Sequence, residues 1–172
     1  YGIRGDNESA IKEYSKAIDL APDDPVLHYN LGIAYLKVDK TISAIGSFEA
    51  SIACPGEFLL SHLRLAQIFR SSKDLSKERK HLEELISLGW DDESYDVQAR
   101  LQEVIEKEED LRSAKEHFIQ GREHFKDGDY DAASEDLLKS LEYDPDNGSA
   151  HNLMGIIYHH KGEDELSRDE YA

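Results

Sequence analysis

Four of the eight histidines in the sequence form two pairs with the same separation. His28 and His62 are 34 residues apart, and so are His117 and His151. Imidazole is the commonest side-chain ligand of transition metals, so a metal site is the first hypothesis for this spacing. Metal ligands must converge within about 2.1 Å of one ion, whereas equivalent positions on successive packed helices lie roughly 8–10 Å apart. We therefore expect these histidines to have structural roles and to hold no metal.

A group of aspartates, Asp127, Asp129 and Asp131, resembles the start of a calcium-binding loop. Such a loop needs a glycine at its sixth position and a bidentate glutamate at its twelfth position. Ala132 and Leu138 occupy these two positions. The sequence therefore predicts no calcium site here.

The patterns typical of catalytic sites are equally incomplete. Glu78 and His81 form a single E-x-x-H pattern, whereas di-iron bundles need two such patterns and further glutamates. We expect both residues to lie on a solvated surface. The sequence has no phosphate-binding glycine loop and no G-x-S-x-G, H-E-x-x-H or Cys-x-x-Cys motif. We therefore expect a chain that is not an enzyme and that needs no cofactor.

The balance of charge limits the classes of partner. The 20 Lys and Arg residues oppose 37 Asp and Glu residues, which gives a net charge of −17. Binding to a phosphate backbone depends on clustered cations, so we expect no nucleic-acid partner. The nearest approach to a basic cluster is interrupted by two acidic residues and predicts a solvated helix face; its members are Arg64, Arg70, Lys73, Lys77, Arg79 and Lys80.

Cysteine content and hydropathy bear on the compartment. Cys54 is the single cysteine and cannot form an internal disulfide, which fits a reducing, cytoplasmic compartment. We expect it to be an inert core residue. No apolar run approaches the ~20 residues that cross a bilayer, and no signal-peptide pattern is present, so we expect no membrane insertion.

The elements that must position these residues follow a repeat. Residues 25–58 read PVLHYNLGIAYLKVDKTISAIGSFEASIACPGEF, in which small and large side chains alternate at helical spacing. A shift of 34 residues aligns Leu31, Gly32, Tyr35 and Phe48 with Leu65, Ala66, Phe69 and Leu82. A fixed period of this length is typical of stacked helical hairpins.

These residues resemble the tetratricopeptide repeat (TPR) family. The pattern W-x2-L-G-x2-Y, then A-x3-F, is met by His28, Leu31, Gly32, Tyr35, Ala44 and Phe48, with histidine in place of tryptophan. The resemblance implies an all-α, right-handed TPR solenoid of antiparallel helix pairs. It also implies that His28 and its equivalents replace tryptophan between helices. The function implied is that of a non-catalytic scaffold for protein–protein interaction.

The period divides the chain into two blocks. We expect the first block to contain a partial repeat, 1–24, and the repeats 25–58 and 59–92. The second block is expected to contain the repeat 114–147 and the partial repeat 148–172. Because the chain begins and ends inside repeats, we expect it to be a piece of a longer polypeptide.

The segment 93–113 interrupts the period. It contains no Gly or Pro and carries apolar residues on one side, so we expect one acidic amphipathic helix. This helix either packs as an unpaired helix of the solenoid or runs on into the helix that starts near Ala114. We favour packing, because the apolar stripe needs a cover.

Details within the first block depart from an ideal repeat. We expect Gly5 to end one helix before the next begins. In the third unit, Glu78 and Trp90 stand where Ala44 and Pro22 stand in their repeats. Since a large residue occupies a position that favours a small one, we expect the third helix pair to sit wider or rotated.

The resemblance places the partner-binding residues on the first helices, which line a concave face in the TPR family. A mixture of apolar side chains and polar donors suits an extended segment or helix of a partner. In the first block these residues are Val26, Tyr29, Ile33, Leu36, Lys37, Leu60, Leu63, Arg64, Gln67 and Arg70. In the second block they are Lys115, Phe118, Arg122, Phe125, Asn152, Ile156 and His159.

Some TPR proteins clamp the C-terminal carboxylate of a partner with Lys, Asn and Arg. Asn30 and Arg64 match two of these positions, but Leu60, Phe118 and Arg122 do not match, so we do not expect capture of a chaperone tail. Two further alternatives stay open. The chain is a self-assembling module, or it is the regulatory or substrate-recruiting part of a larger enzyme.

Overall fold

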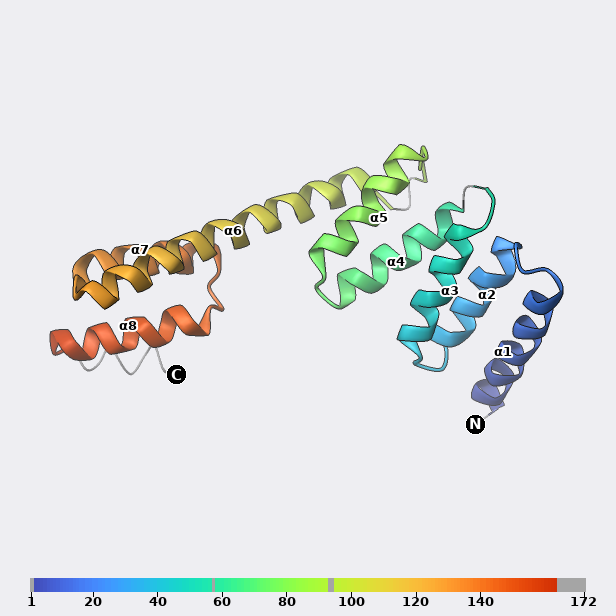
Figure 1. Ribbon diagram of the computed structural model, residues 1–172, viewed down its shortest axis with the longest axis horizontal. Coiled ribbons are helices and arrows are strands. Elements are labelled where there is room, and N and C mark those ends of the chain that lie inside the picture. Colours follow the sequence, from blue (N-terminus) through green and yellow to red (C-terminus); the bar gives the residue numbers. More distant parts are fainter. Residues whose placement is uncertain (1, 57, 93–94, 164–172) are drawn as a thin grey trace. The chain divides into compact units, whose positions relative to one another are not determined.

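The computed structural model describes residues 2–56, 58–92 and 95–163, and all secondary structure in these ranges is α-helical (Figure 1). The chain forms two compact units, Tyr1–Val104 and Ile105–Ala172. The all-α class predicted from the repeat is confirmed. The helices are α1 (Gly2–Leu20), α2 (Pro25–Leu36), α3 (Thr41–Ala53), α4 (Leu59–Ser71), α5 (Leu75–Ser87), α6 (Val97–Asp127), α7 (Tyr130–Tyr143) and α8 (Gly148–Lys161).

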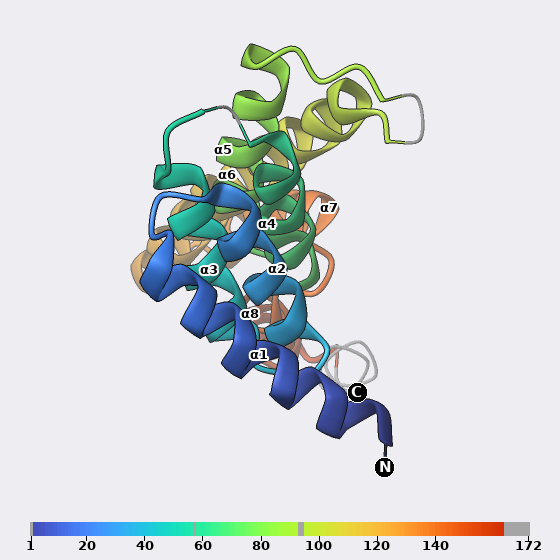
Figure 2. The same cartoon turned by 90° about the vertical axis from the view of Figure 1, so that its right-hand side faces the viewer.

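The first five helices stack in chain order within the first unit. Helix α1 packs on α2, α2 on α3, α3 on α4 and α4 on α5, as Figure 2 shows for the helices coloured from blue to green. Short turns join α2 to α3 and α4 to α5, so each of these pairs is a helical hairpin. The predicted repeats 25–58 and 59–92 each contain one hairpin.

The α2–α3 hairpin closes tightly because a glycine faces an aromatic ring. A Cβ atom at Gly32 of α2 would lie 2.6 Å from a ring carbon of Phe48 on α3. Phe48 is fully buried, together with Ala44 and Leu65. The small residue is therefore required for the close approach of α2 and α3.

The turns within the hairpins repeat in conformation as well as in position. Asp39 and Lys73, which are 34 residues apart, both have positive φ angles, 61° and 58°. Gly128 and Gly162, also 34 residues apart, each have a φ of 81°. The left-handed conformation costs a residue with a Cβ roughly 1 kcal/mol, whereas glycine adopts it freely. The left-handed conformation is thus kept at Asp39 and Lys73, although neither residue is a glycine.

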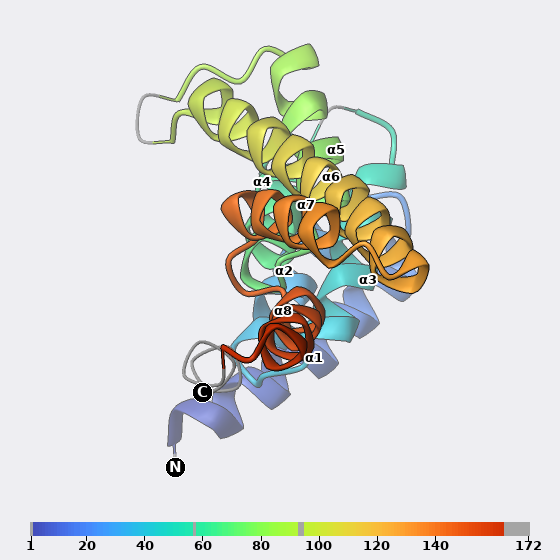
Figure 3. The same cartoon turned by 90° about the vertical axis from the view of Figure 1, so that its left-hand side faces the viewer.

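The second unit contains a similar hairpin and a following helix. A Cβ atom at Gly121 of α6 would lie 2.9 Å from Leu137 of α7, and α7 packs on α8 (Figure 3). The Ser140 hydroxyl donates to the carbonyl oxygen of Ala114 at 2.8 Å. The buried residues of this core are Ala133, Leu137, Ala150, Met154 and Ile157.

The expected boundary between the segment 93–113 and the next helix is wrong. Helix α6 is continuous from Val97 to Asp127, so the segment runs on past Ala114, which was the less favoured alternative. Residues 93 and 94 lie outside the described part. No Gly or Pro stands between Val97 and Gln120, so the backbone can continue as one helix, even though Ser113 and Glu116 have the spacing of a capping box.

The apolar stripe of this segment is covered, as expected, at its first two turns. Val97 and Val104 are buried with Ala66, Leu82 and Leu85 in the core of the first unit. The expected break at Gly5 is absent, because α1 runs from Gly2 to Leu20.

Candidate functional site

Helices α2 and α4 present the ten first-block residues predicted to bind a partner, and we name this set the α2–α4 face. Val26 and Leu60 are 47% and 44% exposed, and Lys37 and Arg70 are also exposed. The other six members are half-buried: Tyr29, Ile33, Leu36, Leu63, Arg64 and Gln67. No member is fully buried, so each retains some surface for contact.

Three members of the α2–α4 face are linked across the two helices. Arg64 donates from Nε to the hydroxyl oxygen of Tyr29 at 3.3 Å and from Nη1 to Oε1 of Gln67 at 3.0 Å. The first bond joins α2 to α4, the second lies within α4, and together they fix the plane of the guanidinium group. The spacing of the residues along each helix did not predict this network, because the repeat says nothing of polar pairing between helices.

Several members of the α2–α4 face are also part of the core. The Tyr29 ring lies 5.6 Å from the ring of Phe48 and meets the Phe58 ring edge-on at 5.3 Å. Leu63 packs against the core cluster that contains Leu82 and Leu85. Phe58 was not among the predicted residues; its only signal in the sequence is its place just before α4. Val26 and Leu60 are therefore better probes of binding than Tyr29 and Leu63.

The second-block residues lie on α6 and α8. Lys115, Arg122, Asn152 and His159 are exposed, and Phe118, Phe125 and Ile156 are half-buried. Phe118 and Phe125 pack against the core of the second unit. Nη2 of Arg122 lies 3.6 Å from a carboxylate oxygen of Glu123, so its charge is partly neutralised within α6.

The four histidines that form pairs 34 residues apart make three kinds of contact. Nε2 of His28 lies 2.7 Å from the carbonyl oxygen of Pro22, and Nε2 of His151 lies 2.9 Å from that of Pro145. His117 lies 3.3 Å from a carboxylate oxygen of Asp136. Each histidine thus holds a neighbouring loop or helix. The described residues contain no group of three or more His, Cys, Asp and Glu side chains that fits a metal ion.

The fourth histidine, His62, forms a buried pair with His81. Their Nδ1 atoms are 3.1 Å apart, and the His81 ring stacks on Phe69 with a centroid distance of 5.7 Å. Burial, followed by the proximity of His62 and Lys80, lowers the pKa of His81 to about 4. Burial also lowers the pKa of His62. Both rings are therefore neutral at pH 7, with one donating its Nδ1 proton to the other.

The structure corrects the prediction for the E-x-x-H pattern. Glu78 and His81 are 0% and 7% exposed, so neither lies on a solvated surface. A pocket of about 300 Å³ opens beside the two histidines and is lined by Glu49, Ile52, His62, Lys80, His81 and Glu84. The lining offers a neutral imidazole pair and side chains of both charges.

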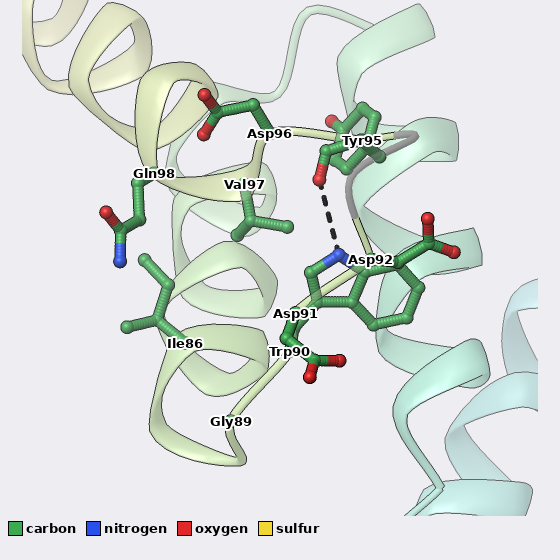
Figure 4. Close-up of a pocket in the computed structure, with 9 residues that line it drawn as sticks. All are labelled: Ile86, Gly89, Trp90, Asp91, Asp92, Tyr95, Asp96, Val97 and Gln98. Carbon is green, nitrogen blue, oxygen red and sulfur yellow. Dashed lines mark hydrogen bonds between the residues drawn. The ribbon is translucent and has the colours of Figure 1, made fainter.

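A larger pocket of about 530 Å³ lies at the turn between α5 and α6 (Figure 4). The indole nitrogen of Trp90 donates to the carbonyl oxygen of Tyr95 at 3.2 Å and closes this turn. Burial raises the pKa of the Tyr95 hydroxyl, and the nearby Arg70 opposes this rise. None of the predicted partner-binding residues lines this pocket.

Comparison with known proteins supports the repeat. A family model described as TPR repeat matches residues 1–39 and 121–162. Comparison with curated protein sequences gave no significant match. None of the helices that the structure describes is both long and apolar enough to span a membrane.

Two solved structures share the fold. One is the TPR domain of P58(IPK), with a TM-score of 0.57 and 17% identity over 96% of this chain. This chain spans 54% of that structure, about half its length. The other is the TPR2AB domain of yeast Sti1 in complex with pHSP90, with a TM-score of 0.50 and 16% identity over 95% of this chain and 68% of that one. The matched residues are therefore TPR repeats, and the chain has the fold of a TPR solenoid.

Proposed function

We propose that the chain is a non-catalytic protein-interaction scaffold that holds an extended segment or helix of a partner protein on the α2–α4 face. The observation that carries this proposal is the exposure of two apolar side chains, Val26 and Leu60, on neighbouring first helices. They lie in the same predicted row as Tyr29, Arg64 and Gln67, which are linked by hydrogen bonds. Apolar anchors next to fixed polar donors are the usual composition of a binding surface.

The fold supports the same function. TPR2AB of yeast Sti1, which shares the fold, was solved in complex with pHSP90. That complex shows a TPR domain engaging another protein. The row of first-helix residues offers this chain a comparable means of binding.

The test uses a library of random 12-residue peptides displayed on phage and selected on the whole chain. Selected peptides are then synthesised, and their affinity is measured for the wild type and for Leu60→Asp. A charge buried in an apolar contact removes an anchor, so we expect at least a tenfold loss, about 1.4 kcal/mol. The matched control is Ile42→Asp, since Ile42 is an exposed apolar residue of α3 in the same unit, at 88% exposure.

The control should bind within about twofold of the wild type. Equal affinity of Leu60→Asp and the wild type for every selected peptide would contradict the proposal. Retention of the helical signal by circular dichroism distinguishes loss of binding from loss of folding.

A second candidate function is self-assembly. Leu20 and Ile42 are both 88% exposed, which leaves their apolar side chains available for contact with a second copy. Static light scattering against concentration measures the mass directly. A mass that rises with concentration in the wild type and stays constant in Ile42→Asp would favour this function.

A further inference from the structure

The two helices of the α2–α4 face contain no carboxylate. The chain has 37 Asp and Glu residues in 172, yet α2 and α4 contain none in 12 and 13 residues. The helices paired with them, α3 and α5, carry Glu49 and the glutamates at 78, 83 and 84. Acidic residues are thus placed on the second helices and are absent from the first helices of this unit.

The charges that the α2–α4 face does carry are all positive. They are Lys37, Arg64 and Arg70, and all of them retain exposed surface. This local sign is opposite to the net charge of −17 of the whole chain. Because charges more than about 8 Å apart are largely screened at physiological salt, a bound segment responds to the nearby cations more than to the distant net charge.

Arg64 is already oriented for an anion. Its Nε and Nη1 atoms donate to Tyr29 and Gln67, which are neutral, and no carboxylate of the described residues contacts it. The hydrogen bonds hold the planar guanidinium group in place, and they involve Nε and Nη1 rather than Nη2. A guanidinium group fixed in this way binds a carboxylate with little further loss of side-chain entropy.

Resting on the proposed function, we propose that the partner segment is acidic. Its side-chain carboxylates contact Arg64 and Arg70, while its apolar side chains cover Val26 and Leu60. The apolar contacts would supply most of the affinity, and the cations would select the sign of the charge and the register.

The peptide selection tests this inference through the charge of the enriched sequences. The displayed peptides are fused through their C-terminal ends, and the synthetic peptides are amidated, so no terminal carboxylate contributes. A chain of net charge −17 attracts basic peptides by its long-range field. Acidic enrichment therefore arises only if the cations of the α2–α4 face determine selection.

The variant Arg64→Glu/Arg70→Glu should bind the selected acidic peptides at least tenfold more weakly than the wild type. The matched control, Lys12→Glu/Lys16→Glu, makes the same change in net charge on exposed positions of α1 and should bind within twofold. If the glutamates prevent folding, Arg64→Gln/Arg70→Gln should give a smaller loss in the same direction.

The outcomes separate the two proposals. Enriched peptides that are neutral or basic, and that still bind Leu60→Asp more weakly, would contradict the proposal that the partner segment is acidic. The proposed function would then still stand. The acidic segment would also be overturned if the arginine variant and the lysine control lost affinity equally. Peptides unaffected by Leu60→Asp would overturn the proposed function itself.

Discussion

Arg100 of α6 forms a two-pronged ion pair with Glu78 of α5. Its Nε lies 2.7 Å from Oε1 and its Nη2 lies 3.0 Å from Oε2 of the glutamate, which is fully buried. Glu78 stands where Ala44 stands in the preceding repeat, so the sequence predicted a disturbed helix pair there. The hydrogen bonds to Glu78 and then to Glu103 raise the pKa of Arg100 further above its usual range. The guanidinium group therefore stays charged and neutralises the buried carboxylate.

Removal of Arg100 alone should strongly destabilise the first unit. Arg100→Ala leaves the buried carboxylate unpaired, which costs about 3–5 kcal/mol, whereas removal of both charges costs much less. Urea unfolding followed by the fluorescence of Trp90, the single tryptophan, measures the change in this unit. The double variant Glu78→Ala/Arg100→Ala should be more stable than Arg100→Ala. Equal stability of these two variants would show that the ion pair is not coupled.

The His62–His81 pair makes the stability of the first unit depend on pH. Both pKa values are lowered in the folded state, so below pH 6.5 the unfolded chain binds more protons than the folded chain. Stability is therefore fully present above pH 6.5 and is lost as the pH falls from 6.5 toward about 4, the pKa of His81. At pH 5 the loss from His81 should be about 2 kcal/mol.

The measurement compares the urea midpoints at pH 7 and pH 5. The charged groups that line the pocket beside the pair are Glu49, Lys80 and Glu84. Of these, Glu84 favours the protonated form of His62 and Lys80 opposes it. His81→Gln cannot be protonated and should show a smaller loss between the two pH values. An unchanged loss would assign the pH dependence to other groups.

Two glycines in one hairpin should respond oppositely to alanine. Gly32→Ala places a methyl group 2.6 Å from the buried Phe48 ring and should cost about 1–3 kcal/mol. Gly46→Ala in α3 meets nothing within 4 Å and should stabilise by about 0.5–1 kcal/mol, because glycine is unfavourable inside a helix. Thermal unfolding of the two variants, monitored by circular dichroism, checks both signs. A loss of stability in both would contradict the close contact as the cause.

Sequence reasoning predicted the features that the repeat itself determines. The helical hairpins follow from small and large residues that alternate at a fixed period. Burial of Glu78 and His81 was missed because the period does not show which side chains pair across helices. Arg100 belongs to the segment without a period, and the His62 contact depends on how two rings meet across a hairpin. The continuity of α6 was the less favoured alternative, since a repeat pattern marks where units begin but not whether a helix stops between them.

The candidate site was likewise predicted only in part from the sequence. The resemblance to the TPR family assigned Val26 and Leu60 to one row, and the structure shows both exposed. The hydrogen bonds from Arg64 to Tyr29 and Gln67 depend on the spacing and rotation of α2 against α4. No linear pattern contains that information, because the residues concerned are up to 35 positions apart.

Photo-crosslinking tests the central claim most directly. A selected peptide that carries a diazirine group is irradiated with the whole chain, and the crosslinked residues are identified by mass spectrometry. We predict crosslinks to residues 26–37 of the α2 region and 60–70 of α4, and their loss in Leu60→Asp. Crosslinks confined to α3, α5 or α7, unchanged in Leu60→Asp, would contradict binding on the α2–α4 face.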